Sequence, residues 1–508
     1  MDYASADLAA RVEEAEIYSV AVRTSLSVAP LLSERLGNRV LLKREDQQPT
    51  FSFKTRGAAN KVLGLPDDAL ARGVICSSAG NHAQGVALAA SRRGTRAIIV
   101  MPETTPEIKI DAVRALGGEV VLHGESYDDA QTLALARAEA EGLAFVHPFD
   151  DLSVIAGQGT IGREILDQVT GDLDAVFVPV GGGGLAAGIA TYIKVKRPEV
   201  KVFGVEPVDA ASMAAALDAG RPVTLDQVGS FADGVAVKRV GERTFDFCRR
   251  HLDGIVTVTT DELCTAIRDI FEDTRTIVEP SGALAVAGIR RWVEQESAQD
   301  RTLVAVNCGA NMNFDRLGHV TERTAIGENR EAILAVEIPE RKGSFLQFCR
   351  AIGERHVTEF NYRRNRADRA MIFVGLELRG GETDRMALVD HLKSQGYEVA
   401  DLTENEMAKV HVRHLAGGVV SDVAAERVYR FEFPERRGAL LAFLHAVGID
   451  WNITLFHYRN HGSDYGRVLV AVEVPEPTRA EFQRHLDDLG YPYWDETDND
   501  AYRLFLKG

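Results

Sequence analysis

The stretch Pro49-Thr50-Phe51-Ser52-Phe53-Lys54-Thr55-Arg56-Gly57-Ala58 decides how the rest of this chain is interpreted. Apolar residues 40–42 ahead of it predict a strand, and residues 55–63 predict a helix. A lysine held among apolar neighbours has its ammonium form disfavoured, so its amine can act as a nucleophile. Lys54 is therefore a candidate Schiff-base lysine. The alternative is a solvated surface group, which is what most lysines are.

Two further stretches strengthen the interpretation of Lys54. Ser78-Ala79-Gly80-Asn81-His82 leaves a predicted strand and opens a predicted helix, where backbone N–H groups favour a carboxylate. Gly181-Gly182-Gly183-Gly184-Leu185 also lies between a predicted strand and a helix, and glycines suit a backbone wrapped around a phosphate. A lysine amine, a carboxylate site and a phosphate site together indicate pyridoxal phosphate holding an amino acid.

The glycine stretch has a rival interpretation as a dinucleotide site. Gly182-x-Gly184-x-x-Ala187 fits that fingerprint, and Glu206 follows 22 residues after Gly184, near the spacing for an acid on a ribose hydroxyl. The glycine motif alone cannot separate the two cofactors. Lys54 and residues 78–82 would have no role in a nicotinamide enzyme, so pyridoxal phosphate is favoured.

The composition is that of an ordinary globular protein. The 508 residues suffice for three or four domains, with 45% hydrophobic and 26% charged residues. A net charge of −17 argues against nucleic acid or an anionic membrane as a partner. The five cysteines are scattered without a C-x-x-C pair, which predicts reduced thiols and no zinc site. With no signal peptide and no apolar stretch of spanning length, the expected location is cytoplasmic.

Residues 39–325 alternate short apolar runs with longer amphipathic segments, which predicts parallel sheets covered by helices. In such sheets ligands bind at the carboxyl ends of strands, where the suspected site stretches fall. The predicted strands are 74–76, 96–101, 119–122, 144–147, 175–180, 202–205, 255–258 and 303–307, and the helices between them include 106–116, 127–141, 155–169 and 281–296.

An internal repeat begins beyond Asn329. Ile338-Pro339-Glu340-Arg341-Lys342-Gly343 is matched 95 residues later by Phe433-Pro434-Glu435-Arg436-Arg437-Gly438. Each copy is predicted to run strand, helix, strand, strand, helix, strand, which is the split βαβ or ferredoxin-like pattern. On this fold alone, the repeat could be merely a dimerisation platform.

These stretches together resemble the fold-type II pyridoxal-phosphate enzymes, and the doubled tail is similar to that of the biosynthetic threonine dehydratases. The resemblance covers the chain from about Ile17 onward and implies an α/β, tryptophan synthase β-like catalytic part followed by two ACT-like domains of α+β class. It implies domains at 1–328, 329–405 and 426–508, with 406–425 connecting the last two. The implied activity is conversion of L-threonine to 2-oxobutanoate and ammonia, towards isoleucine. An L-serine dehydratase or a serine racemase-like enzyme is the alternative.

The family also implies roles for individual residues. Lys54, with Phe53 beside it, would hold pyridoxal phosphate and then remove the Cα proton. Asn81 would bind the ring hydroxyl, and Cys308 would face the ring nitrogen where relatives often carry serine. Residues Ser78, Ala79, Gly80, Asn81 and His82 would bind the substrate carboxylate, and Gly181, Gly182, Gly183, Gly184 and Leu185 the phosphate. The cation-binding acids of some relatives are incomplete here, with Ser212 at the second position, so no metal is expected.

The resemblance implies a homotetramer inhibited by isoleucine, with valine as an opposing effector and L-serine as a secondary substrate. Tyr362-Arg363 and Tyr458-Arg459 occupy equivalent places in the two repeats, so they are the candidate effector contacts. An arginine can pair with a carboxylate and a tyrosine ring can cover an apolar side chain. The alternative is that the tyrosines are ordinary half-buried strand residues and the arginines are solvated.

Overall fold

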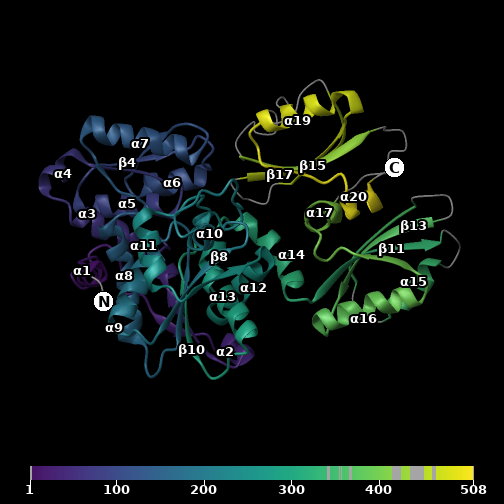
Figure 1. Cartoon of the computed structure of the whole chain (residues 1–508), viewed down its shortest axis with the longest axis horizontal. Helices are drawn as coiled ribbons and strands as arrows, with labels where there is room; N and C mark the ends of the chain where they lie inside the picture. The colour runs from purple at the N-terminus through teal and green to yellow at the C-terminus, as the bar shows by residue number, and fades with distance from the viewer. Residues whose placement is uncertain are drawn as a thin grey trace. The chain divides into compact units, whose positions relative to one another are not determined.

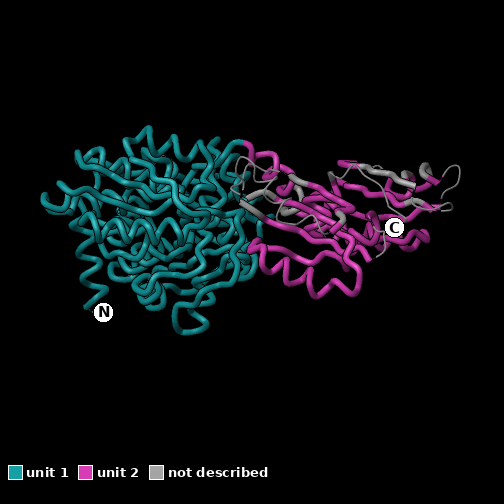
Figure 2. Tube along the Cα trace, turned by 90° about the horizontal axis from the view of Figure 1, so that it is seen from above, with its two compact units in different colours: residues 1–314 teal, residues 315–508 magenta. Residues whose placement is uncertain are grey.

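The computed structural model describes residues 3–339, 344–353, 355, 357–364, 369–414, 425–434, 451–459 and 465–506. The chain divides into two compact units, Met1–Phe314 and Asp315–Gly508 (Figure 2). The predicted domain boundaries at 328, 405 and 425 remain predictions.

The first unit contains two sheets (Figure 1). The larger has the strand order β1-β2-β10-β7-β8-β9. Its pairs are parallel except for β1, which is antiparallel to β2. Its strands are β1 (Leu26–Val28), β2 (Arg39–Arg44), β7 (Ala175–Pro179), β8 (Lys201–Pro207), β9 (Gly254–Val258) and β10 (Thr302–Asn307).

The smaller sheet has the order β5-β4-β3-β6 and is entirely parallel. Alternate residues of β3 enter different cores: Val74 and Cys76 pack in a cluster with residues of α5, whereas Ile75 packs in a cluster with Ala130 and Ala134 of α7. Both faces are therefore covered, as a parallel sheet requires. The strands are β3 (Val74–Ser77), β4 (Ala97–Met101), β5 (Glu119–Leu122) and β6 (Ala144–Phe145).

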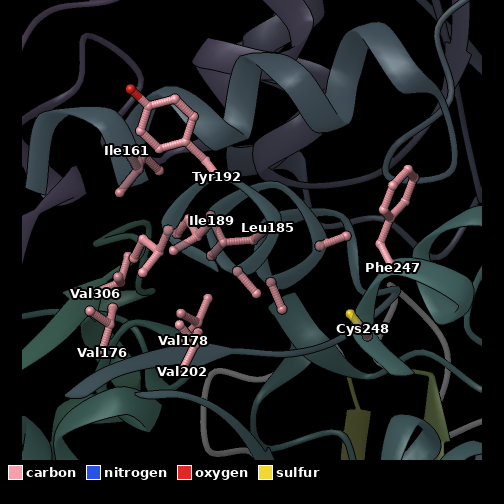
Figure 3. Close-up of a cluster of buried hydrophobic side chains, with 14 of the residues drawn as sticks. Ile161, Val176, Val178, Leu185, Ile189, Tyr192, Val202, Phe247, Cys248 and Val306 are labelled. Atoms are coloured by element: carbon pink, nitrogen blue, oxygen red, sulfur yellow. The ribbon is translucent and has the colours of Figure 1, made fainter. Parts of the chain in front are cut away.

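The helices of this unit cover both sheets. They are α1 (Tyr3–Glu13), α2 (Pro30–Leu36), α3 (Lys54–Leu63), α4 (Asp67–Arg72), α5 (Asn81–Arg93), α6 (Glu107–Ala115), α7 (Tyr127–Glu141), α8 (Leu152–Gln168), α9 (Gly184–Lys196), α10 (Ser212–Ala219), α11 (Glu242–His251), α12 (Thr260–Thr274) and α13 (Pro280–Glu296), with short 3₁₀ turns η1 (Glu45–Gln47) and η2 (Asp233–Val235). Leu185 and Ile189 of α9 pack against Val176, Val178 and Val202 of the larger sheet (Figure 3).

Helix α3 lies between α5 and α8, and thus joins the layers of the two sheets. Glycines permit this approach: a Cβ at Gly157 would lie 2.6 Å from the carbonyl oxygen of Arg56, and one at Gly85 would lie 3.1 Å from that of Lys54. The guanidinium of Arg56 is buried and pairs with Glu45 at 2.7 Å and Glu164 at 2.6 Å. Breaking such a buried pair is costly, so α3 is held firmly in place.

The boundary between the units falls within η3 (Phe314–Arg316), and the described part of the second unit then contains α14 (Leu317–Gly327) and two antiparallel sheets. Their orders are β12-β13-β11-β14 and β16-β17-β15-β18, the same arrangement twice. The elements are β11 (Glu331–Pro339), α15 (Ser344–Ile352), β12 (Val357–Arg364), β13 (Arg369–Glu377), α16 (Gly381–Ser394), β14 (Glu398–Asp401), α17 (Glu406–Val410), η4 (Val412–His414), β15 (Glu426–Pro434), β16 (Asn452–Arg459), β17 (Tyr465–Glu473), η5 (Glu476–Thr478), α19 (Arg479–Asp488), β18 (Tyr493–Asp495) and α20 (Asp500–Phe505).

Each copy ends in a helix that follows its fourth strand. The N-cap residues of these helices, Asn405 and Asn499, are hydrogen-bonded to each other at 2.9 Å. Met407 of α17 and Tyr502 of α20 share one core cluster with residues from both sheets. The two copies therefore bury apolar surface together.

The predicted fold class is confirmed. The first unit has parallel sheets with helices on their faces, and the second has antiparallel sheets with the repeated ferredoxin-like strand order.

Candidate active site

The turn that carries Lys54 is bonded to the end of β10. Ser52 and Gly309 form an isolated antiparallel bridge, and the N–H of Phe53 donates to the carbonyl oxygen of Cys308 at 3.0 Å. Phe51 adopts a left-handed φ of 53° and accepts a 2.9 Å hydrogen bond from the N–H of Ala310. Since this conformation is disfavoured for a bulky residue, these contacts hold the turn in a specific shape.

The amine of Lys54 is placed in an unusual environment. Nζ donates to the carbonyl oxygen of Pro148 at 3.0 Å and lies 5.1 Å from the ring centroid of Phe53. Burial lowers the pKa of Lys54 from 10.5 to about 8, while Cys308 and Glu279 act in the opposite direction. A much larger fraction of this amine is therefore neutral near pH 7 than in an exposed lysine.

The stretch Ser78–His82 follows β3 and opens α5. Its turn is closed by two bonds, from the N–H of Ser78 to the carbonyl oxygen of Val100 and from the N–H of Gly80 to Oγ of Ser78. Within the described chain no acceptor takes the N–H groups of Ala79 or Asn81. Amides of this kind at a helix N-terminus can bind a carboxylate.

The side chain of His82 is not suited to binding a charged group. It is buried, and its Nε2 lies 2.9 Å from the carbonyl oxygen of Val146, which can only accept. Nε2 therefore carries the proton, and Nδ1 has no hydrogen-bond partner. Burial lowers the pKa of His82 to about 3, so the ring is neutral at physiological pH. Its contribution to an anion site would come from its backbone N–H.

The glycine loop, residues 181–184, leads from β7 into α9 and has no room for side chains. A Cβ at Gly182 would lie 2.3 Å from the ring of Phe149, and one at Gly184 would lie 2.9 Å from the carbonyl oxygen of Phe149. Gly183 has a φ of 93°. Oγ1 of Thr244 donates to the carbonyl oxygen of Gly182 at 2.6 Å, which fixes the direction of that peptide. The loop thus presents a helix N-terminus suited to a phosphate.

Glu206 argues against the dinucleotide interpretation of this loop. The carboxylate is buried and accepts hydrogen bonds from the N–H groups of Met213 and Ala214, at 2.8 and 2.9 Å. Burial raises its pKa to about 7. The carboxylate therefore accepts hydrogen bonds from the first turn of α10 and is not available to a ribose hydroxyl.

Residues 148–150 connect the lysine to the glycine loop. The carbonyl of Pro148 holds Lys54, Phe149 packs on the loop, and Oδ1 of Asp150 accepts from the N–H of Thr244 at 3.1 Å. Sequence reasoning missed this segment. Its only signal was its position just after a predicted strand, because its partners Lys54 and Thr244 lie far away in the sequence.

Two buried acidic groups complete the site. Sγ of Cys308 lies 3.3 Å from the carbonyl oxygen of Ser281, and burial raises the pKa of this thiol. Oε1 of Glu279 accepts from Nδ2 of Asn81 at 2.8 Å and from Oγ of Ser281 at 2.7 Å. Burial, with a contribution from Asp233, raises the pKa of Glu279. The structure therefore brings Lys54, Asn81 and Cys308 into one connected group of residues.

These residues fit pyridoxal phosphate. The group needs an amine of low pKa, an amide-rich anion site for its phosphate and neutral partners for its ring. Lys54, the glycine loop and Cys308 have these properties. The individual assignments of site residues remain predictions.

The predicted effector residues lie in equivalent edge strands. Tyr362 of β12 is opposite Ile372, and Tyr458 of β16 is opposite Val468. Arg363 and Arg459 follow them in the same strands. The side chains of all four residues lie outside the part of the chain that the structure describes.

The described residues contain no group of three or more His, Cys, Asp or Glu side chains arranged to hold a metal ion. Among the same residues, no helix combines the length and the apolar character needed to cross a bilayer.

Comparisons with known proteins cover almost the whole chain. Residues 18–309 match the family described as pyridoxal-phosphate dependent enzyme, and residues 322–412 and 417–506 each match the C-terminal regulatory domain of threonine dehydratase. The chain is 57% identical over 507 residues to L-threonine dehydratase biosynthetic IlvA of Burkholderia multivorans, covering 99% of this chain and 100% of that protein. It is 52% identical over 497 residues to the Escherichia coli protein of that name, covering 98% and 96%.

Solved structures align with part of the chain. The processed form of threonine deaminase isoform 2 from Solanum lycopersicum aligns with a TM-score of 0.63 and 50% identity, over 64% of this chain and 94% of that chain. A serine racemase from Dictyostelium discoideum aligns with a TM-score of 0.56 and 31% identity, over 60% of this chain and 99% of that one.

Proposed function

Because the chain belongs to the family of biosynthetic threonine dehydratases, which depend on pyridoxal phosphate, we propose that it converts L-threonine to 2-oxobutanoate and ammonia. This reaction would be the committing step towards isoleucine. The observation that carries the proposal is the amine of Lys54, whose pKa is lowered to about 8 and which donates to Pro148, next to the Phe149 that packs on the glycine loop.

When bound, pyridoxal phosphate supplies an electron sink that acidifies the Cα–H bond of an amino acid. The N–H groups of Gly181, Gly182, Gly183, Gly184 and Leu185 would bind its phosphate. The stretch Ser78–His82 would bind the substrate carboxylate and orient the Cα–H bond. The thiol of Cys308 is neutral and could not hold a proton on a ring nitrogen as a carboxylate would, which favours rapid loss of the leaving group.

Lys54 would act as the base that removes the Cα proton. Its Nζ donates a hydrogen bond to the carbonyl oxygen of Pro148, which carries no formal charge that would stabilise the ammonium form. Since the pKa of the amine is about 8, its deprotonated form is accessible at working pH. The ring of Phe53 lies against the same amine and limits its contact with water.

Threonine is favoured over serine as the main substrate by the second unit. An L-serine dehydratase or a serine racemase-like enzyme would share the first unit, and the Dictyostelium racemase aligns over only 60% of this chain. The repeated second unit instead matches the regulatory domain of threonine dehydratase. L-Serine would be a secondary substrate. A cytoplasmic homotetramer remains our expectation from the family.

The test is keto-acid release by the purified holoenzyme with threonine and serine added separately. Lys54→Ala should fold and lose turnover together with the visible absorption of the covalently held cofactor. Exposed Lys201→Ala is the matched control and should keep both. Steady-state turnover of threonine by Lys54→Ala would overturn the assignment of Lys54, and a higher kcat/KM for serine would favour the alternative.

We also propose that the second unit binds isoleucine as an inhibitor and valine as an opposing effector. The match to a regulatory domain and the equivalent positions of Tyr362-Arg363 and Tyr458-Arg459 support this proposal. Tyr362→Ala or Arg459→Ala should raise the isoleucine concentration for half inhibition several-fold, since allosteric couplings are about 1–3 kcal/mol. Uninhibited turnover should stay near normal. Unchanged inhibition curves for all four alanine variants would remove these strands from consideration.

A further inference from the structure

A continuous chain of hydrogen bonds crosses the candidate active site. Nδ2 of Asn311 donates to the carbonyl oxygen of Thr50 at 2.8 Å and to Oδ1 of Asn81 at 2.7 Å. Nδ2 of Asn81 donates to Oε1 of Glu279 at 2.8 Å. The chain thus begins at the lysine turn, passes through the start of α5 and ends at the start of α13.

The donors and acceptors in this chain determine the orientation of both amides. The carbonyl oxygen of Thr50 can only accept, so the nitrogen of Asn311 must face it. The second hydrogen of that nitrogen then requires the oxygen of Asn81, which leaves the nitrogen of Asn81 facing Glu279. If the amide of Asn81 were flipped, its nitrogen would face the nitrogen of Asn311, and its oxygen would face the oxygen of Glu279. Asn81 keeps one amide hydrogen that neither neighbour uses.

The carboxyl group of Glu279 is tightly enclosed. The residue is 5% exposed, and its Oε1 also accepts from Oγ of Ser281 at 2.7 Å. A Cβ at Gly309 would lie 2.5 Å from Oε1 of Glu279, and one at Gly234 would lie 2.5 Å from Oγ of Ser281. Two glycines are therefore required to make room for this acceptor. Because it is packed in this way, the carboxyl group offers the amide of Asn81 an acceptor at a fixed position.

We propose that Glu279 is a positioning residue: with Asn311 it fixes the amide of Asn81 so that the remaining N–H is presented to the ring hydroxyl of the cofactor. The inference rests on the proposed function, which gives Asn81 that partner. Glu279 acts only through Asn81. Its required property is the acceptor oxygen at Oε1, which a glutamine in the same place would also offer.

The first test compares Glu279→Ala with Glu279→Gln in the holoenzyme. The readouts are the wavelength of the cofactor's visible absorption maximum and the Kd for pyridoxal phosphate. Glu279→Ala should shift the maximum and weaken binding roughly five-fold or more, as expected for losing a buried hydrogen bond, and Glu279→Gln should restore both. A glutamine variant that behaves like the alanine variant would overturn the proposal, because the charge and not the acceptor would then matter.

The second test asks whether Glu279 acts through Asn81. Adding Glu279→Ala to Asn81→Ala should cause no further shift of the absorption maximum. An additional shift would overturn the proposal. If Asn81→Ala alone leaves the spectrum unchanged, the proposed contact of Asn81 fails, and the inference fails with it. If Asn81→Ala shifts the spectrum while Glu279→Ala does not, only the inference fails.

Two further variants guard against a loss of folding. Asn311→Ala removes the other end of the chain of bonds at a partly exposed residue, and it should shift the absorption maximum in the same direction as Glu279→Ala. Glu206→Gln alters a second buried glutamate of the same unit, one that contacts the start of α10. It should leave the spectrum unchanged whatever it does to stability. A spectral shift in Glu206→Gln equal to that in Glu279→Ala would overturn the proposal.

Discussion

Substitutions of Cys308 test whether the proposed partner of the cofactor's ring nitrogen must be neutral. Its thiol lies 3.3 Å from the carbonyl oxygen of Ser281 and is kept protonated by burial, which raises its pKa. Cys308→Ser keeps a neutral donor of similar size, so we expect kcat within a few-fold of the parent. Cys308→Asp places a carboxyl group beside Glu279 in a buried site, and we expect altered cofactor absorption and a changed ratio of elimination to side reactions. An aspartate variant with parental absorption would place Cys308 away from the ring nitrogen.

The burial of His82 predicts that the free energy of unfolding depends on pH in the acid range. Burial holds the pKa of its ring at about 3 in the folded state, below the ordinary value of 6.5. Between these values the unfolded chain binds more protons than the folded chain, so the free energy of unfolding falls as pH decreases from about 6.5 towards 3. The slope is at most about 1.4 kcal/mol per pH unit.

His82→Gln should reduce this slope, since an amide does not titrate but can still donate to the carbonyl of Val146. Denaturant unfolding of the first unit at several pH values measures the effect. His123→Gln, at an exposed histidine of the same unit, is the control. Equal slopes in the parent and in His82→Gln would show that His82 is not buried in a neutral form.

At the scale of residues, the sequence singled out the candidate chemical groups and missed the residues that contact them. Lys54 and the two candidate anion-binding stretches stand out because their residue types are unusual for their positions. Glu279 was not among the predicted site residues, since nothing local shows that its carboxyl group reaches Asn81, 198 residues away. Pro148 acts through a backbone carbonyl, which any residue would offer.

At the scale of elements, the glycine loop should tolerate no side chain. Gly182→Ala would put its Cβ 2.3 Å from the ring of Phe149, which also packs on Gly184. We expect weaker binding of pyridoxal phosphate and a lower Tm, because overpacking usually costs about 1–3 kcal/mol. Gly254→Ala is the control, since its Cβ would meet the ring of Phe203 at an ordinary 3.5 Å. Unchanged cofactor affinity in Gly182→Ala would mean that the loop does not bind the phosphate.

Some elements were predicted with the bounds that the structure shows. Predicted helix 127–141 matches α7, and predicted strand 119–122 matches β5. Short β1 was missed, because three residues give too little pattern. The helices α17 and α20 were also missed, since they are short and bury their apolar residues in a core shared by both repeats. Such a core is a tertiary feature that no local period reveals.

At the scale of the whole molecule, the repeat detected in the sequence corresponds to a repeated sheet order. Equivalent positions also make equivalent contacts: Oγ1 of Thr403 accepts from the N–H of Ile333, and Oγ1 of Thr497 accepts from the N–H of Val428, each at the same place in its copy. Repetition to this level means that the two copies have related surfaces. It does not require that both bind the same effector with equal affinity.

A separable second unit predicts that regulation can be removed without removing catalysis. The proposed catalytic residues all precede Asp315, where the second unit begins. A chain ending at Gly327 should therefore release keto acid from threonine and show no inhibition by isoleucine. It retains α14, whose Arg323 pairs with Glu406 in the full chain, so some loss of stability is expected.

A second shortened chain, ending at Phe314, also lacks α14. It controls for the surface of α14 that the truncation at Gly327 exposes. Light scattering should first establish that each shortened protein is soluble and monodisperse, and inhibition curves at one threonine concentration should follow. If the loss of regulation comes from the missing effector site, both shortened chains should ignore isoleucine while their kcat values differ. A soluble chain 1–327 that is still inhibited by isoleucine, with an unchanged half-inhibition concentration, would place the effector site in the first unit and leave the repeated sheets without the proposed role.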